Sequence, residues 1–111
     1  MAEEQACRFL EGKGLKLLTH NYSCRQGEID LVMRDNEMLV FVEVRYRRSK
    51  DYGSAVESVD SRKQAKLIST AQHYLQQHRQ AARHPCRFDV VGISPCGADF
   101  EIEWLSNAIE M

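Results

Sequence analysis

The sequence predicts an α/β domain with a mixed five-stranded sheet flanked by helices. The chain has 111 residues, of which 43% are hydrophobic and 28% are charged, as is typical of one soluble globular domain. Two strand-like runs around a short polar turn indicate a β-hairpin in residues 27–48. A long helical pattern separates this hairpin from two further strand-like runs, which indicates helices packed on a mixed sheet. We therefore expect a single domain spanning residues 1–111.

The chain is expected to begin with a helix and a weak strand. Residues 3–11 form an amphipathic helical pattern. Its apolar stripe consists of Ala6, Phe9 and Leu10. Gly12 follows this stripe and is expected to end the helix. Residues 15–22 are weakly strand-like, and residues 21–26 are polar and turn-like.

The predicted hairpin carries acidic residues in apolar surroundings. Its second strand, residues 39–44, is apolar on both faces except at Glu43, which is typical of a strand covered on both sides. On the first strand, Asp30 also has apolar neighbours. Side chains alternate along a strand, so Glu43 and Arg45 should point the same way. Because a buried charge is costly unless it is paired or bound to a metal, we expect a functional site here.

A polar loop and the longest helix follow the hairpin. Residues 47–60 favour irregular structure with a short turn at 55–57, and a loop of this length suits a position beside a site. Ser61 and Gln64 form a capping-box pattern that opens the helix. Apolar residues recur at helical spacing from there, and the helix is expected to fade near residues 79–83.

Two strands are expected to complete the sheet. They correspond to residues 87–93 and 100–105, and the tail after them is expected to be a frayed helical turn. The long helix joins the strand of Glu43 to the strand at residues 87–93, so these two strands are expected to pair in parallel through a crossover. In the strand at residues 87–93, Asp89 has a simple structural interpretation as the partner of Arg87.

The net charge of −1 excludes a global basic field that would attract nucleic acid, but local basic clusters exist. One cluster, interleaved with Tyr46, consists of Arg45, Arg47, Arg48 and Lys50. A second cluster consists of Arg62, Lys63 and Lys66. The first cluster is either a contact for a DNA backbone, which its position beside the carboxylates favours, or a solvated loop. Lys63 either reaches the carboxylates or is a surface residue of the first helical turn.

The first residues carry no secretory signal, and no apolar run approaches the length that spans a bilayer. We therefore expect a cytoplasmic protein without a membrane partner. The four cysteines include no Cys-x-x-Cys pair, so the spacing favours free thiols in a reducing compartment over a zinc site.

Asp30 and Glu43 lie on neighbouring strands, which are about 5 Å apart, so their carboxylates are expected to converge on one ion. Two carboxylates with open water positions suit Mg²⁺ or Mn²⁺, and the main-chain carbonyl of Val44 is a candidate further ligand. Arg45 is placed to stabilise developing charge on a phosphate. This combination indicates metal-assisted hydrolysis of a phosphodiester. The structural alternative is a buried ion pair of the carboxylates with Arg45 or Arg25.

The motifs around these residues resemble a known family. The pattern Asp, spacer, Glu-x-Arg is similar to the PD-(D/E)xK signature of the restriction-endonuclease-like superfamily. The matching motifs are Gly27-Glu28-Ile29-Asp30-Leu31-Val32, Val40-Phe41-Val42-Glu43-Val44-Arg45-Tyr46-Arg47, Tyr52-Gly53, Lys63, Tyr74-Leu75 and Arg87-Phe88-Asp89-Val90. Together they resemble the YraN family of predicted bacterial endonucleases, which are similar to Holliday-junction resolvases. The resemblance covers nearly the whole chain.

The resemblance implies a Mg²⁺- or Mn²⁺-dependent endonuclease acting on structured, branched or single-stranded DNA. It implies that Asp30 and Glu43 are metal ligands and catalytic residues, and that Arg45 occupies the position of the superfamily lysine. Glu4 matches the acidic residue that many resolvase-like members place near the metal, and a surface pair with Arg8 is the alternative. A homodimer would suit two-strand cleavage of a symmetric junction.

Two departures from the superfamily pattern favour a second function. Arginine does not lose its proton as lysine does, so Arg45 suits a phosphate clamp and not a general base. The proline that usually precedes the first aspartate is replaced by Ile29. The alternative to an endonuclease is therefore a catalytically silent nucleic-acid-binding adaptor of the same fold.

Overall fold

The computed structural model describes residues 2–48 and 55–110 as an α/β domain with a mixed five-stranded sheet, which confirms the predicted fold class. In chain order the elements are α1 (Ala2–Gly12), β1 (Lys16–Cys24), β2 (Gly27–Asp35), β3 (Met38–Tyr46), the 3-10 helix η1 (Ala55–Ser58), α2 (Ser61–Gln77), the 3-10 helix η2 (Ala81–Arg83), β4 (Cys86–Cys96) and β5 (Asp99–Ile109). Lys50 and the Tyr52-Gly53 motif lie outside the described residues. No helix within the described ranges is long and apolar enough to cross a membrane.

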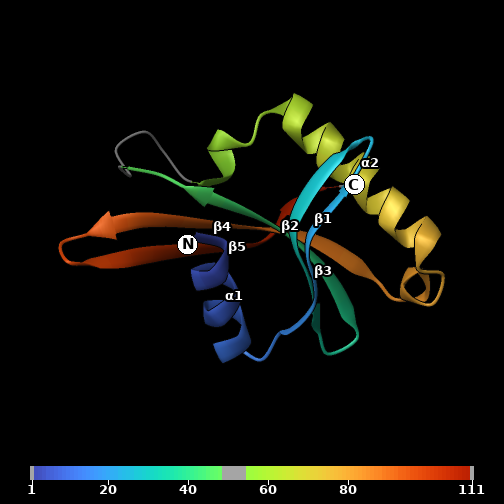
Figure 1. Cartoon of the computed structure of the whole chain (residues 1–111), viewed down its shortest axis with the longest axis horizontal. Coiled ribbons are helices and arrows are strands. Elements are labelled where there is room, and N and C mark those ends of the chain that lie inside the picture. The colour runs from blue at the N-terminus through green and yellow to red at the C-terminus, as the bar shows by residue number, and fades with distance from the viewer. Residues whose placement is uncertain (1, 49–54, 111) are drawn as a thin grey trace.

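The strands lie in the order β1-β2-β3-β4-β5. Neighbouring strands are antiparallel except β3 and β4, which pair in parallel from Leu39↔Cys86 to Tyr46↔Ile93. The connection between these two strands contains α2, which confirms the predicted crossover. Figure 1 shows α1 on one face of the twisted sheet and α2 on the other, with the β4–β5 hairpin extending to one side.

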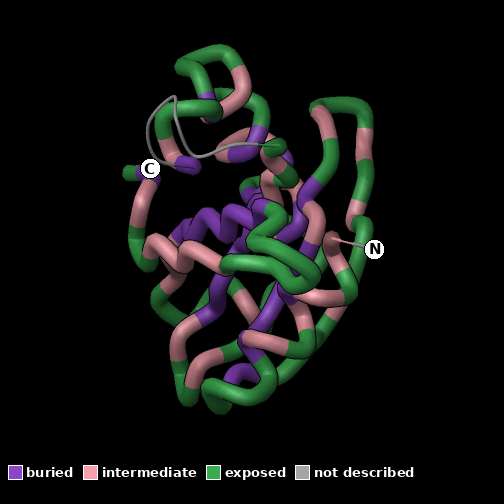
Figure 2. Tube along the Cα trace, turned by 90° about the vertical axis from the view of Figure 1, so that its left-hand side faces the viewer, coloured by how far each residue is buried: buried purple, intermediate pink, exposed green. Residues whose placement is uncertain are grey.

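Each face of the sheet has its own hydrophobic core. The core under α2 includes Ile29, Val32, Leu39, Phe41, Leu67, Tyr74, Phe88 and Val90. The core under α1 includes Ala6, Leu10, Leu31, Met33, Val40, Val42, Val91 and Ile93. In Figure 2 the buried segments run through the centre of the molecule and the exposed segments surround them. Because β3 contributes alternate residues to both cores, its sequence is apolar on both faces.

The N-terminus of α2 is capped one residue earlier than the sequence indicated. Asp60 is the N-cap, and its carboxylate accepts a hydrogen bond from the main-chain nitrogen of Lys63 at 2.9 Å. Ser61 is the first helical residue, and the Gln64 amide donates to the carbonyl of Val59 instead of completing a capping box. A cap of this kind contributes about 1 kcal/mol and fixes the turn from which the Lys63 side chain projects.

Three predicted strands ended too early. β4, predicted at residues 87–93, continues to Cys96. β1 continues to Cys24, which leaves only residues 25–26 for the turn before β2. β5 continues to Ile109, so the prediction of a frayed helical turn in the tail was wrong. Pairing with β4, and not the local sequence, determines the structure of this tail.

Asp89 anchors the end of β5. Its fully buried carboxylate accepts hydrogen bonds at 2.8–3.2 Å from two nitrogens of Arg87, from Nε1 of Trp104 and from the main-chain nitrogen of Asn107. Asn107 has a φ of 54° and lies within the register shift between β4 and β5. The partnership of Asp89 with Arg87 is confirmed, and the carboxylate also holds the irregular part of β5 in place.

The short helix η1 is docked on β4 and β5. The main-chain nitrogen of Ala55 donates to Oε1 of Glu103 at 2.8 Å. Ala55 also lies against Gly92, where an added Cβ would come within 2.6 Å of the Cβ of Ala55. Glycine at this position in β4 therefore permits η1 to approach the sheet closely.

Gly92→Ala should displace η1 and destabilise the domain by about 1–3 kcal/mol, the usual cost of overpacking. Urea unfolding of the variant and of the wild type measures this difference. Gly12→Ala is the matched control, because no atom lies within 4 Å of its added Cβ. The control should stay within about 0.5 kcal/mol of wild type. Unchanged stability of Gly92→Ala would contradict the docking of η1 described above.

Candidate functional site

The predicted site lies where β2 and β3 separate. Their antiparallel pairing ends at Leu31↔Val42, whereas β3 continues beside β4. The carboxylate of Asp30 lies at this opening, and its Oδ2 accepts a hydrogen bond from the main-chain nitrogen of Val44 at 2.8 Å. The side chain of Asp30 therefore accepts the hydrogen bond that a main-chain carbonyl of β2 would accept if the two strands stayed paired.

A break in side-chain alternation places Asp30 at the border of the two cores. Ile29 belongs to the core under α2 and Leu31 to the core under α1, although strict alternation would put both on one face. Asn21 lies between the two β1 residues that pair with them, and its φ is 54°. Asparagine adopts this left-handed conformation more readily than most residues. Both strands are thus distorted beside Asp30, which is half-buried.

Glu43 is a buried carboxylate between two cations. It is 4% exposed, and its Oε2 lies 3.5 Å from Nη1 of Arg45 and 3.5 Å from Nζ of Lys63. The pKa of Glu43 is raised to about 7, first by burial and then by the Asp30 carboxylate, against the opposing effect of the two cations. The carboxylates of Asp30 and Glu43 therefore lie close enough to repel each other, as their predicted convergence requires.

Arg45 is held in place by η1. Its Nε donates to the hydroxyl of Ser58 at 3.1 Å, and its Nη2 donates to the carbonyl of Ser58 at 3.2 Å. The Ser58 hydroxyl in turn donates to the carbonyl of Ala55 at 2.6 Å. Because a guanidinium stays protonated, this arrangement gives the site a fixed positive charge.

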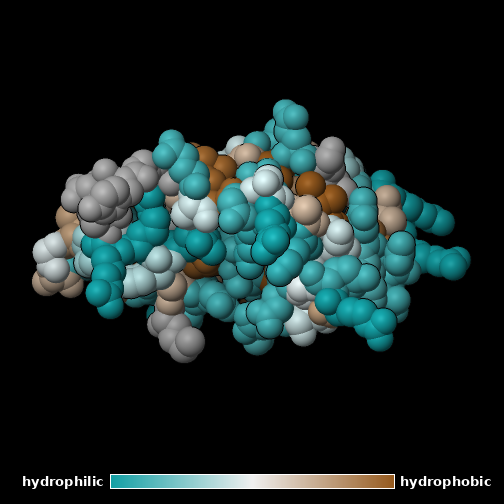
Figure 3. Space-filling model, turned by 90° about the horizontal axis from the view of Figure 1, so that it is seen from above, coloured by the Kyte–Doolittle hydropathy of each residue, from teal (hydrophilic) through white to brown (hydrophobic). Residues whose placement is uncertain are grey.

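Lys63 reaches the site from the first turn of α2. Its side chain is 39% exposed, so it contacts Glu43 while remaining open to solvent. Of the two interpretations of Lys63, the one that brings it to the carboxylates is confirmed, whereas its contact with nucleic acid stays a prediction. Figure 3 looks onto the α2 side of the molecule, where hydrophilic side chains cover most of the surface.

The other residues of the first basic cluster have different positions. Arg48 is exposed. The side chain of Arg47 is only 14% exposed, and its Nη2 lies 3.7 Å from Oε1 of Glu103 on β5. Arg47 therefore packs over the neighbouring strands instead of extending into solvent beside Arg48. Lys50 lies outside the part of the chain that the structure describes.

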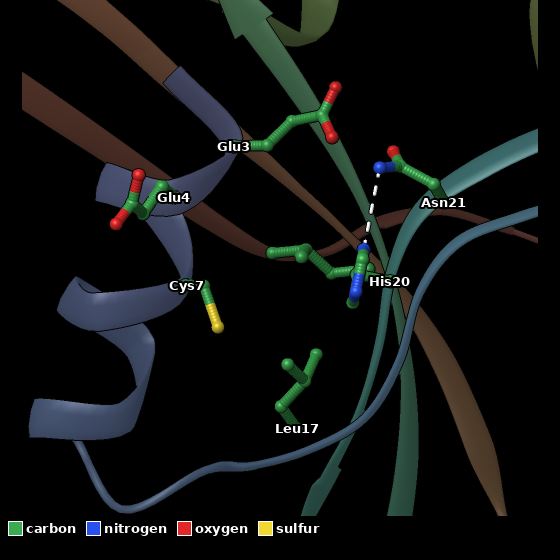
Figure 4. Close-up of a pocket in the computed structure, with 7 residues that line it drawn as sticks. Glu3, Glu4, Cys7, Leu17, His20 and Asn21 are labelled. Atoms are coloured by element: carbon green, nitrogen blue, oxygen red, sulfur yellow. Dashed lines mark hydrogen bonds between the residues drawn. The ribbon is translucent and has the colours of Figure 1, made fainter. Parts of the chain in front are cut away.

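The first helix directs Glu3, and not Glu4, toward Asp30. Glu4 forms an exposed ion pair with Arg8 at 2.7 Å, which was the alternative given by their spacing. Figure 4 shows the Glu4 side chain turned away from the other labelled side chains and the Glu3 carboxylate turned toward Asn21. The pKa of Glu3 is raised, first by burial and then by the charge of Asp30.

Helical spacing alone would have identified Glu3. It lies three and seven positions before Ala6 and Leu10, so all three share one face of α1. Ala6 and Leu10 are fully buried, which carries Glu3 to the sheet side of the helix. The motif match placed the acidic residue at Glu4, one position away and on the solvent side.

The site has an acidic side and a basic side. Asp30 and Glu28 lie near Glu3, whereas Arg45 and Lys63 lie against Glu43. Across residues 2–48 and 55–110, no group of three His, Cys, Asp or Glu side chains is arranged to hold a metal ion. A metal between Asp30 and Glu43 would therefore need water, main-chain or phosphate oxygens as well, which Mg²⁺ and Mn²⁺ accept. The oxygen donors and the repulsion between the two carboxylates fit a divalent cation.

These features define a one-domain α/β protein whose sheet opens around two carboxylates flanked by two cations. The chain belongs to Uncharacterised protein family UPF0102, whose model matches residues 2–93. This result confirms the expected resemblance at the level of the family. The link to the restriction-endonuclease-like superfamily and to resolvases stays a prediction.

Relatives in several bacteria match nearly the whole chain. A UPF0102 protein of Stutzerimonas stutzeri is 55% identical over 98% of this chain and 91% of its own length. UPF0102 proteins of Nitrosococcus oceani and Coxiella burnetii are 55% and 53% identical, each over 99% of this chain and 89% of their own length. A solved structure, Pyrococcus furiosus SfsA in complex with Ca²⁺, matches 98% of this chain and 61% of its own with 11% identity and a TM-score of 0.35. That score is too low to support an argument about function.

The stability of the metal-free protein should depend on the charge of Glu43. Its folded-state pKa of about 7 lies above the ordinary value of 4.5, so the folded state favours the protonated form. The resulting loss of stability is absent below pH 4.5, grows as the pH rises from 4.5 to about 7, and stays constant above that pH. Glu43→Gln should therefore be more stable than wild type by about 1–3 kcal/mol at pH 8, with a smaller difference at pH 5.

Chemical unfolding in EDTA at both pH values measures this effect. Asp89→Asn is the matched control, because its carboxylate accepts four hydrogen bonds and should be needed at both pH values. A Glu43→Gln variant that is less stable than wild type at pH 8 would instead show that Glu43 forms a structural ion pair.

Proposed function

We propose that this protein is a Mg²⁺- or Mn²⁺-dependent endonuclease of the restriction-endonuclease-like superfamily, acting on structured, branched or single-stranded DNA. The observation that supports it most is the convergence of Asp30 and Glu43 where two strands separate, with Arg45 and Lys63 at one oxygen of Glu43. A buried carboxylate and a half-buried one that repel each other are an unfavourable arrangement unless a cation joins them.

The residues of the site divide the work of phosphodiester hydrolysis. Asp30 and Glu43 would hold the metal ion, which when bound lowers the pKa of water and offsets the charge of the phosphate. Arg45 and Lys63 would bind the non-bridging phosphate oxygens from the basic side of the site. In the reaction the oxygen of water bonds to phosphorus, one phosphorus–oxygen ester bond breaks, and the leaving oxygen takes up a proton.

Asp30→Asn should abolish metal binding and reduce cleavage at least about 100-fold, because it removes a charged ligand. Calorimetric titration with Mn²⁺ measures the binding, and cleavage of four-way junction, flap and single-stranded DNA in Mg²⁺ or Mn²⁺ measures the activity. Asp99→Asn is the matched control, since this aspartate is exposed in the β4–β5 hairpin. If the wild type cuts none of these DNA molecules with either metal, the nuclease proposal is wrong.

Lys63→Ala should weaken DNA binding about tenfold and lower the slope of log affinity against log salt by about one, as expected for one lost phosphate contact. Arg62→Ala removes the same charge from the preceding residue of α2, which is exposed, and should weaken DNA binding less. Fluorescence anisotropy at several salt concentrations measures both variants. Equal losses in the two variants would show that the basic surface acts only through its total charge.

A catalytically silent nucleic-acid-binding adaptor is the second candidate. The hydrogen bonds of Arg45 to Ser58 favour it, because a fixed guanidinium holds a phosphate but does not accept a proton. In this case the wild type would bind DNA without cutting it, and an Asp30→Ala/Glu43→Ala double variant would retain that binding.

A further inference from the structure

A pocket of about 360 Å³ lies between α1 and β1, next to the acidic side of the site. Its lining consists of Glu3, Glu4, Cys7, Leu17, His20, Asn21 and Leu31. Figure 4 shows the polar groups of Glu3, Asn21 and His20 at one end, with Leu17 and Cys7 toward the other. This volume and this mixture of apolar wall and few polar groups are typical of sites for small organic groups.

The charges around the pocket determine which part of a nucleotide it accepts. Three carboxylates, those of Glu3, Asp30 and Glu28, bring negative charge to this side of the site, so it repels a phosphate. Arg45 and Lys63 attract a phosphate on the other side of the carboxylate pair. A nucleotide at the site would therefore place its phosphate on the cations and its uncharged base toward the pocket.

The polar groups of the pocket offer a defined pattern of hydrogen bonds. The amide nitrogen of Asn21 is always a donor, so Nδ1 of His20, 3.4 Å away, is the acceptor and Nε2 carries the proton in the neutral ring. Glu3 provides a carboxylate acceptor, and Figure 4 shows this carboxylate turned toward Asn21. One carboxylate and one ring N–H complement the Watson–Crick edge of guanine, which presents two adjacent N–H donors and a carbonyl oxygen.

Apolar surface in the pocket suits the flat face of such a base. Leu17 is 36% exposed, which leaves a large aliphatic side chain partly open to solvent on the edge strand β1. Leu31, on the neighbouring strand, is buried and closes the wall. The Watson–Crick edge is available only in a base that is not paired, so the pocket selects unpaired positions in DNA.

We propose that this pocket binds an unpaired guanine of the DNA whose phosphate lies on Arg45 and Lys63. The proposal rests on the proposed nucleic-acid function and specifies which feature of structured DNA the protein recognises. Recognition of one extruded base would direct the site to bulges, flaps and junctions in preference to intact duplex.

The test compares the affinities of wild type for two duplexes that differ at one unpaired position, which holds guanine in one and an abasic sugar in the other. Fluorescence anisotropy in Ca²⁺ buffer at fixed salt, with the DNA recovered intact, gives both values. The guanine duplex should bind at least about fivefold more tightly, as expected for one base in contact with protein. Glu3→Gln should reduce this ratio to about one, because a neutral amide no longer accepts both N–H groups.

Two further variants complete the test. Glu37→Gln removes the same charge from an exposed glutamate in the β2–β3 turn and should keep the wild-type ratio. Leu17→Trp fills the pocket at a partly exposed position and should lower the ratio without altering charge. Equal affinity of wild type for the two duplexes, or an unchanged ratio in Glu3→Gln, would overturn the pocket proposal and leave the nuclease proposal standing. Absence of binding to both duplexes would overturn both proposals.

Discussion

The burial of Glu43 beside Asp30 is the constraint on which the site depends. A carboxylate that is 4% exposed and faces a second carboxylate raises the energy of the folded chain unless nearby groups offset the charge. The protein supplies the main-chain nitrogen of Val44 to Asp30 and the cations of Arg45 and Lys63 to Glu43. The separation of β2 and β3 provides the space in which these groups meet.

Each of these groups is positioned by a different part of the fold. Gly92 allows η1 to dock on β4, and η1 then holds the guanidinium of Arg45 through Ser58. The cap at Asp60 fixes the first turn of α2, which carries Lys63. Since the supports come from η1, α2 and the sheet, the arrangement of charges exists only when the whole domain is folded.

Features that depend on neighbouring residues in the sequence were predictable, and features that depend on distant contacts were not. The hairpin brings Asp30 and Glu43 together through local pairing, and the apolar pattern of β3 reflects its cover on both faces. The contact of Lys63 with Glu43 depends on how α2 crosses the sheet, which residue spacing does not specify.

The two errors have different origins. β5 extends beyond its predicted end because Asp89, eighteen residues earlier, binds the main-chain nitrogen of Asn107. Glu3 faces the site because its helix packs through Ala6 and Leu10, and the motif match to Glu4 did not take this packing into account. For β5, tertiary packing decided the outcome where the local sequence permitted more than one structure. For Glu3, the helical spacing from Ala6 and Leu10 already indicated the correct face of α1.

A comparison of two buried carboxylates in the sheet distinguishes a structural charge from a candidate functional one. Asp89 accepts four hydrogen bonds at 2.8–3.2 Å, which is full satisfaction for a carboxylate in a protein interior. Glu43 has two cations at 3.5 Å, longer than the ~2.7–2.9 Å of charge-assisted hydrogen bonds. Its pKa is raised by burial, in spite of those cations. A carboxylate needed only for stability would be expected to resemble Asp89, so the weaker pairing of Glu43 supports a role in binding a ligand.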